Sequence, residues 1–228
     1  MAYSRRQKIA IVDYGMGNLF SVKLACERVG LEAFIVNKGS DFLKASALIL
    51  PGVGAFGEAM DTLNKLNLIE PIRNFIDSGK PFLGICLGMQ LLMSESEEFG
   101  LHKGLDIIKG RVIRFPLQDF EGGSKVPQVG WNKIFKPDYK PKDEWENSLL
   151  KGIKEREDYI YFVHSFYTIP ASKEIILSLT SYAGVNYCSS LQIRNIFACQ
   201  FHPERSGPTG LQIYENLAIL LKTHQRVE

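Results

Sequence analysis

The stretch Pro-Phe-Leu-Gly-Ile-Cys-Leu-Gly-Met-Gln at residues 81–90 decides how this chain folds. Residues 81–85 are a short apolar run typical of a buried strand, and residues 87–93 have the pattern of the start of a helix. Cys86 stands between them, with a glycine two residues before it and another two residues after it. This spacing is typical of a sharp strand-to-helix turn that presents a nucleophile, and the helix N-terminus favours a thiolate. The sequence therefore predicts a reactive thiol at Cys86 rather than a merely packed one.

A thiol nucleophile needs a base, and a motif far downstream supplies one. Phe-His-Pro-Glu at residues 201–204 places His202 two residues before Glu204. A carboxylate beside a histidine fixes the tautomer of the imidazole and stabilises its charged form. We expect Pro203 to keep this segment extended, so that His202 and Glu204 point the same way.

His164 is the other histidine that could act as this base. It ends a strand-like run, but Ser165 and Phe166 follow it where a carboxylate would be needed. A core position suits His164 better, so the sequence favours His202.

Short apolar strands alternate with helical patterns through the first hundred residues. Strands are expected at residues 8–12, 33–36, 47–50 and 81–85, and helices at residues 19–29, 56–66 and 68–78. Strand-like runs then predominate at residues 111–115, 129–135, 159–163, 175–181, 191–193 and 196–200, with a polar loop at 136–146 and a closing helix at 209–223. The pattern predicts an α/β protein with an open, mixed, mainly parallel sheet, helices on both of its faces and a β-rich C-terminal half. No repeat or linker interrupts the chain, so we expect residues 1–228 to form a single domain.

The composition argues against several classes of protein. A net charge of +2 is too small for a dedicated nucleic-acid binder. No apolar run reaches transmembrane length, and the N-terminus lacks the apolar stretch of a signal peptide. The cysteines are scattered without metal-ligand spacing, so we expect a cytoplasmic protein with no metal and no cofactor. The other cysteines, Cys26, Cys188 and Cys199, are expected to be small core or surface residues.

Two glycine-rich turns precede the Cys86 motif along the chain. Residues 13–18 superficially resemble a dinucleotide fingerprint, but Phe20 replaces its third glycine, and the sequence favours a turn in which Asn18 caps the following helix. The second turn, residues 51–56, follows a buried strand and should therefore lie at the same sheet edge as Cys86. Its glycines allow backbone N–H groups to face a reacting carbonyl, although a simple tight turn would also explain them.

Together these motifs resemble the class I (triad) glutamine amidotransferases over nearly the whole chain. Residues 13–19, 129–132, 161–166 and 202–207 are similar to one branch of that family, the glutaminase subunits of imidazole glycerol phosphate synthase. The resemblance implies the class I glutamine amidotransferase fold and hydrolysis of L-glutamine. Cys86 would attack the carboxamide, and His202, oriented by Glu204, would move the protons.

The resemblance also implies roles for residues outside the triad. An oxyanion hole would be formed by Gly52, Val53, Gly54 and the N–H of Leu87, in some members only when a partner is engaged. Glutamine would be bound by Gln90, Glu98, Ser165 and Phe166. The partner would be met by Asn18, Trp131, Tyr161 and Arg205. From the residues alone, a solvated position would suit Glu98 equally well, and core packing would suit Trp131.

Arg205 departs from the family pattern, in which this position is often lysine. Because Arg205 directly follows Glu204 in a segment expected to be extended, its side chain should point away from the triad and toward a partner.

The implied partner is a (β/α)8 cyclase subunit. The two chains would form a heterodimer with an ammonia channel and lyase activity, making imidazole glycerol phosphate and an aminoimidazole carboxamide ribotide in histidine biosynthesis. Three alternatives stay open: a paralogue that supplies ammonia for surface-sugar or pyridoxal phosphate synthesis, a cysteine peptidase-like hydrolase of related fold, and a regulatory module without activity.

Overall fold

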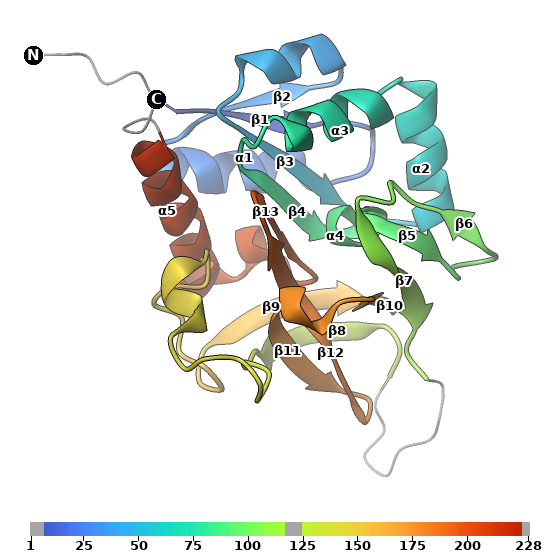
Figure 1. Cartoon of the computed structure of the whole chain (residues 1–228), viewed down its shortest axis with the longest axis vertical. Helices are drawn as coiled ribbons and strands as arrows, with labels where there is room; N and C mark the ends of the chain where they lie inside the picture. Colours follow the sequence, from blue (N-terminus) through green and yellow to red (C-terminus); the bar gives the residue numbers. More distant parts are fainter. Residues whose placement is uncertain (1–6, 117–124, 225–228) are drawn as a thin grey trace, which may run out of the picture.

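One large sheet organises the fold and carries the predicted motifs to a common edge (Figure 1). The computed structural model of the chain describes residues 7–116 and 125–224. Within these residues, eleven strands lie in the order β2-β1-β3-β4-β13-β12-β10-β7-β5-β6, with β11 paired to β12, and a separate pair joins β8 to β9. The strands are β1 (Lys8–Val12), β2 (Glu32–Val36), β3 (Ala47–Gly52), β4 (Phe82–Cys86), β5 (Met93–Ser96), β6 (His102–Lys103), β7 (Ile108–Arg114), β8 (Gln128–Lys133), β9 (Tyr159–His164), β10 (Phe166–Pro170), β11 (Ile176–Tyr182), β12 (Val185–Ile193) and β13 (Ile196–Cys199). The helices are α1 (Leu19–Arg28), α2 (Phe56–Lys65), α3 (Ile69–Asp77), α4 (Leu87–Leu91) and α5 (Gly207–His224), with 3-10 turns η1 (Gly39–Lys44), η2 (Glu144–Asn147), η3 (Lys173–Ile175) and η4 (Pro203–Arg205).

The parallel part of the sheet comes from the first half of the chain and from β13. β1 pairs with β2 and β3, β3 with β4, and β4 with β13, all in parallel. β4 is buried along its whole length, which explains its continuous apolar sequence. Because parallel strands end at the same edge, Gly52 at the end of β3 lies opposite Cys86 at the end of β4.

Helices cover both faces of this sheet, and each face has its own apolar core. On one face, Val22 of α1 packs in a cluster that also holds Leu217 of α5. On the other face, Leu63 of α2 and Ile72 of α3 belong to a second cluster. The predicted α/β class, with a mixed sheet between two helical layers, is confirmed.

The second half of the chain is β-rich, as predicted, and largely antiparallel. β12 pairs with β13, β10 and β11 in antiparallel register, and β10 pairs with β7. Figure 1 shows β8, β9, β11 and β12 gathered below the parallel strands. The sequence pattern missed β5, β6 and β10, which are short or follow another strand directly.

The helix after Cys86 is shorter than predicted. The pattern extended it from residue 87 to 93, but α4 ends at Leu91 and β5 begins at Met93. The reason is a competing set of hydrogen bonds. The N–H of Leu105 donates to the carbonyl of Leu91 (2.8 Å) and that of Ile108 to the carbonyl of Leu92 (2.9 Å), so these carbonyls do not continue the helix.

The predicted surface loop at residues 136–146 has one buried anchor. Trp145 is 4% exposed and donates its indole N–H to the carbonyl of Leu177 at 2.9 Å. Cys26, Cys188 and Cys199 are buried, so of the two positions expected for them, core or surface, they occupy the core. Within the described residues, no helix combines the length and the apolar character needed to cross a membrane.

Candidate active site

The strand-to-helix turn predicted at Cys86 is confirmed by its backbone. Cys86 ends β4 and has φ 54° and ψ −110°, a conformation that costs a non-glycine residue strain energy. The flanking glycines allow the turn to pack tightly. A Cβ on Gly84 would lie 3.0 Å from the carbonyl oxygen of Gly88, and a Cβ on Gly88 would overlap the carbonyl of Leu50. The elbow holds the thiol at the carboxyl edge of the sheet.

His202 and Glu204 are paired, but not by an extended segment. Residues Pro203–Arg205 form the 3-10 turn η4, so the predicted extended conformation is wrong. Proline suits the first position of a helical turn, where its missing N–H has no partner to lose. Within the turn, His202 Nδ1 donates to Glu204 Oε1 at 2.8 Å, and the N–H of His202 donates to the carbonyl of Tyr161 at 2.9 Å.

The charge on His202 is set by its two neighbours. Burial alone would lower the pKa of His202, but the negative charge of a Cys86 thiolate and the carboxylate of Glu204 raise it to about 10. The other ring nitrogen, Nε2, is buried and makes no hydrogen bond. The charges of a Cys86 thiolate and of Glu204 thus favour the imidazolium form of His202, and Nε2 is the ring nitrogen left to exchange a proton.

A pocket of about 420 Å³ opens beside the thiol. It is lined by Val53, Gly54, Cys86, Leu87, Gln90, Glu98, Pro127, Val163, His164, Ser165, Phe166 and Arg205. Residues from separated parts of the sequence, most of them named from motifs, thus meet in one cavity. Among the predicted residues, Gly52, Asn18, Trp131 and Tyr161 lie outside its lining, as do His202 and Glu204.

The loop after β3 lies directly beside the elbow. Tyr14 donates its hydroxyl to the carbonyl of Pro51 at 2.9 Å, which holds the start of this loop. Gly52 is in close contact with its surroundings, since an added Cβ would lie 2.8 Å from Cβ of Leu87. Gly54 has φ +109°, a conformation that favours glycine. The loop thus brings flexible backbone next to Cys86 and Leu87.

The four residues expected to bind glutamine all line the pocket, but much of their hydrogen-bonding capacity is used internally. Gln90 Nε2 donates to the carbonyl of Phe166 and to Gln200 Oε1, both at 3.0 Å, which leaves its amide oxygen available. The carbonyl of Phe166 also accepts from His164 Nδ1 at 2.8 Å, and that of Ser165 accepts from Phe115 at 3.0 Å.

Glu98 is largely buried, at 9% exposed, so a solvated position does not describe it. Its carboxylate accepts from the N–H of Phe56 at 2.7 Å, at the start of α2. Burial raises the pKa of Glu98, while the bond from Phe56 and the nearby His102 oppose the rise. The carboxylate thus joins the rim of the pocket to a helix N-terminus.

Three of the four predicted interface residues form one stack at the pocket rim. The Arg205 guanidinium lies 4.7 Å from the ring centre of Tyr161, and the Tyr161 and Trp131 rings are 5.9 Å apart. The prediction that Arg205 points away from the triad is wrong, because η4 turns it into the pocket lining. Trp131 is 54% exposed, which excludes core packing. Asn18 caps α1, as predicted, accepting from the N–H of Ser21 at 3.4 Å.

One polar residue at this site, Gln200, was missed by the sequence analysis. Gln200 is fully buried and its Nε2 lies 3.5 Å from Cys86 Sγ. Its position two residues before His202, at the end of a strand, was the available signal. His164 was correctly assigned to the core: burial lowers its pKa to about 3, so it stays neutral. Its ring nevertheless borders the pocket.

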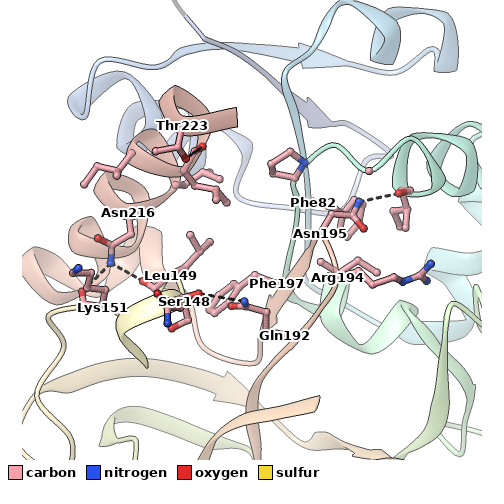
Figure 2. A pocket seen from close by; sticks show the side chains of 18 of the residues that line it. Phe82, Ser148, Leu149, Lys151, Gln192, Arg194, Asn195, Phe197, Asn216 and Thr223 are labelled. Atoms are coloured by element: carbon pink, nitrogen blue, oxygen red, sulfur yellow. Dashed lines mark hydrogen bonds between the residues drawn. The ribbon is translucent and has the colours of Figure 1, made fainter. Parts of the chain in front are cut away.

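A larger cavity, of about 770 Å³, lies at the other edge of the sheet (Figure 2). Phe82, the first residue of β4, and Phe197 of β13 line it, whereas Cys86 ends β4. In Figure 2 the side-chain amides of this cavity bond to backbone carbonyls: Asn195 donates to the carbonyl of Ile76, and Asn216 donates to that of Leu149.

The described residues contain no cluster of His, Cys, Asp and Glu suited to a metal ion. The candidate chemistry is therefore concentrated in the smaller pocket.

Comparisons with known proteins agree with this site. Residues 10–221 match the family described as glutamine amidotransferase class-I. The chain is 44% identical over 210 residues to imidazole glycerol phosphate synthase subunit HisH of Chlorobaculum tepidum, covering 92% of this chain and 98% of that one. It is 46% identical over 212 residues to the subunit of the same name from Aquifex aeolicus, covering 92% and 95%.

Solved structures share the fold at lower identity. PurLQS from Thermotoga maritima superposes with a TM-score of 0.68 at 18% identity, covering 96% of this chain and 99% of that one. A glutamine amidotransferase from the same organism gives a TM-score of 0.59 at 15% identity, covering 96% of this chain and 86% of that one. At these identities the likeness concerns the fold alone.

Proposed function

This chain belongs to the class I glutamine amidotransferases, and on that premise we propose that it is the glutaminase subunit of an imidazole glycerol phosphate synthase. It hydrolyses L-glutamine to glutamate and ammonia, and the ammonia passes to a bound (β/α)8 cyclase subunit. There it is used to make imidazole glycerol phosphate and an aminoimidazole carboxamide ribotide in histidine biosynthesis. The observation that carries the proposal is the strained elbow at Cys86 beside the His202–Glu204 pair, in a chain that matches its relatives nearly end to end.

The first half of the reaction forms a thioester. The Cys86 thiolate attacks the carboxamide carbon of glutamine, and the carbonyl oxygen becomes an oxyanion. We propose that backbone N–H groups of the loop at residues 52–54 and of Leu87, which lie beside the elbow, stabilise that charge. When the carbon–nitrogen bond breaks, His202 gives its proton to the departing amine, which leaves as ammonia.

The second half releases glutamate. Neutral His202 takes a proton from a water molecule, and the resulting nucleophile attacks the thioester carbon. The carbon–sulfur bond breaks, Cys86 returns to the thiolate, and His202 is again an imidazolium. Glu204 stabilises that cation at each cycle through its 2.8 Å bond to Nδ1.

We propose that the remaining pocket residues hold the substrate. Glu98 provides a carboxylate for the α-ammonium group of glutamine, and the free amide oxygen of Gln90 can accept from the same group. Ser165 and Phe166 provide further backbone groups in the lining.

Ammonia is easily protonated or lost, so a partner has to receive it directly. We propose that the cyclase subunit covers the rim formed by Arg205, Tyr161 and Trp131, with Asn18 at its margin, giving a heterodimer with an ammonia channel and an overall lyase activity. The exposed face of Trp131 supports this placement. We assign the protein to the cytoplasm, in keeping with its four free cysteines.

The two enzymatic alternatives receive less support. A paralogue serving surface-sugar or pyridoxal phosphate synthesis, and a cysteine peptidase-like hydrolase, would both share the triad. The relatives at 44% and 46% identity, however, carry the name of the histidine-pathway subunit.

Reconstitution with the cyclase subunit tests this function. Glutamate release and imidazole glycerol phosphate formation are measured for wild type and Cys86→Ala, with either glutamine or ammonium salt as the nitrogen source. The proposal predicts that Cys86→Ala loses both activities with glutamine, by at least about 10³-fold, and keeps synthesis from ammonium. Cys26→Ala, which changes a buried thiol in α1, serves as the control and should keep both. Glutaminase turnover near the wild-type rate in Cys86→Ala would refute the assignment.

A further inference from the structure

Gln200 contacts the thiol of Cys86, and the mechanism above assigns it no role. It follows β13, its side chain is fully buried, and its Nε2 lies 3.5 Å from Cys86 Sγ. Its backbone N–H donates to the carbonyl of Ser189 at 2.9 Å, which fixes the start of the side chain. A buried amide directed at a sulfur atom, rather than at a carbonyl, calls for an explanation.

The orientation of this amide is determined by its neighbours. The carbonyl of Phe166 can only accept a hydrogen bond, so the Gln90 atom 3.0 Å from it is the amide nitrogen. The same nitrogen lies 3.0 Å from Gln200 and therefore needs an acceptor there, which is Oε1 of Gln200. The other end of the Gln200 amide, the NH₂ group, consequently faces Cys86. Turning the amide over would place two donors together and an oxygen against the sulfur.

The thiol has a different contact for each of its protonation states. Its own hydrogen can be donated to the carbonyl of Val163, 4.0 Å from Sγ. The thiolate has no hydrogen to donate and instead accepts from Gln200. A hydrogen bond made to the charged form of a group favours that form.

We propose that Gln200 is the donor that stabilises and aims the Cys86 thiolate, and that Gln90 is a positioning residue that holds the Gln200 amide in this orientation. The proposal rests on the proposed function in that Cys86 is the nucleophile. It gives Gln90 a task inside the protein in addition to any contact with substrate.

The charged and titratable groups around Cys86 are unchanged when the amide of Gln200 is removed. They are His202 and Glu204 from the segment after β13, Arg205 beside them, Glu98 after β5, His164 at the end of β9, the thiol of Cys199 in β13, and the hydroxyls of Tyr14 and Tyr187. A change in the protonation of Cys86 in a Gln200 variant therefore reports the lost hydrogen bond.

The test measures the rate at which iodoacetamide alkylates Cys86 between pH 5 and 10, followed by mass spectrometry of the peptide that contains it. This readout uses neither glutamine nor a partner. In Gln200→Met, which keeps the length of the side chain without a donor, the midpoint of the pH profile should rise by about one unit. Alkylation below the midpoint should accordingly be about 10-fold slower. In Gln90→Met the midpoint should rise by a smaller amount.

Gln212→Met is the matched control, because that amide lies on α5 and bonds to Asn216, away from the pocket beside Cys86. The pH profile of Cys86 alkylation in this variant should equal that of the wild type. An unchanged midpoint in Gln200→Met would overturn the proposal. Should that variant fail to fold, Gln90→Met becomes decisive, and an unchanged midpoint there has the same meaning. Failure of the glutaminase assignment would appear separately, as activity retained by Cys86→Ala.

Discussion

At the scale of single residues, two buried histidines near Cys86 differ in charge, since one ring stays neutral and the other favours the cation. His164 donates its Nδ1 hydrogen to the carbonyl of Phe166, and burial keeps its ring neutral, with a pKa lowered to about 3. His202 is also buried, but the charges of Cys86 and Glu204 outweigh burial and raise its pKa to about 10. The environment thus separates a structural histidine from one that can carry a proton.

His164 should make the protein sensitive to acid. Its pKa of about 3 in the folded protein lies below the 6.5 of an ordinary histidine, so between these values the unfolded chain binds a proton that the folded chain does not. The free energy of unfolding should therefore fall by about 1.4 kcal/mol per pH unit as the pH drops below 6.5. Urea unfolding at pH 7, 6 and 5 measures this slope. The His164→Asn variant lacks the proton-binding site and should show a shallower slope; equal slopes would contradict the assignment.

At the scale of elements, the site depends on two short segments that end strands. The elbow after β4 aims the thiol, and the 3-10 turn after β13 aims both the histidine and the arginine. Neither segment has a sizeable apolar face of its own. Each is held by close packing and by hydrogen bonds to the sheet, so small changes in either should have large effects.

The elbow should not tolerate a methyl group at Gly88. A Cβ there would overlap the carbonyl of Leu50, so Gly88→Ala should lower the free energy of unfolding by about 1–3 kcal/mol. Gly17→Ala is the control, because a Cβ at Gly17 would make only ordinary contacts, the nearest 3.4 Å from Pro51, and should cost less than about 1 kcal/mol. Urea denaturation measures both variants. Equal stabilities for the two would show that the close approach does not constrain the elbow.

Arg205 should matter for coupling to the partner more than for the chemistry at Cys86. Its guanidinium stacks on Tyr161 at the rim. If the partner buries this charge, Arg205→Ala should reduce the free energy by which the partner stimulates glutamate release by about 2–5 kcal/mol. Covalent labelling of Cys86 by a glutamine-like electrophile should persist. Arg156→Ala removes a similar stack, on Phe135 at 4.0 Å, and should leave coupling intact. If both variants couple like wild type, Arg205 is only a surface residue.

At the scale of the whole molecule, one sheet connects the site to its supports. Parallel strands from the first half end beside β13, so Gly52, Cys86 and the segment carrying His202 reach a common edge. The sheet takes strands from both halves of the described residues, and one domain for residues 1–228 stays a prediction. The pocket opens at this edge, where we expect a second protein to control it.

The isolated chain should be a slow glutaminase. The loop at residues 52–54 contains two glycines and can hold more than one backbone arrangement, so its N–H groups need not all face the oxyanion before a partner docks. Adding the cyclase subunit with its nucleotide ligand should raise glutamate release by about 5- to 150-fold, the usual range of coupling between sites. Full activity of the chain alone would reject this coupling.

The sequence predicted those features of the fold and the site that residues close together in the chain determine. The flanking glycines sufficed to predict the elbow at Cys86, and the spacing of His202 and Glu204 sufficed to predict their pairing. The direction of Arg205 could not be predicted in this way, because Pro203 is compatible with both an extended segment and a helical turn. The length of α4 was set by hydrogen bonds from residues 105–108, and the role of Gln200 by contacts with Cys86 and Gln90, neither of which is close in sequence.

Selective labelling tests the central claim, that the elbow and the His202–Glu204 pair make Cys86 the nucleophile for glutamine. The reconstituted complex is treated with a diazoketone analogue of glutamine, and the modified residue is identified by peptide mass spectrometry, with and without excess glutamine. We predict one label on Cys86, protection by glutamine, and no label on the buried Cys26, Cys188 or Cys199. A label on another residue, or labelling of Cys86 that glutamine does not slow, would contradict the account.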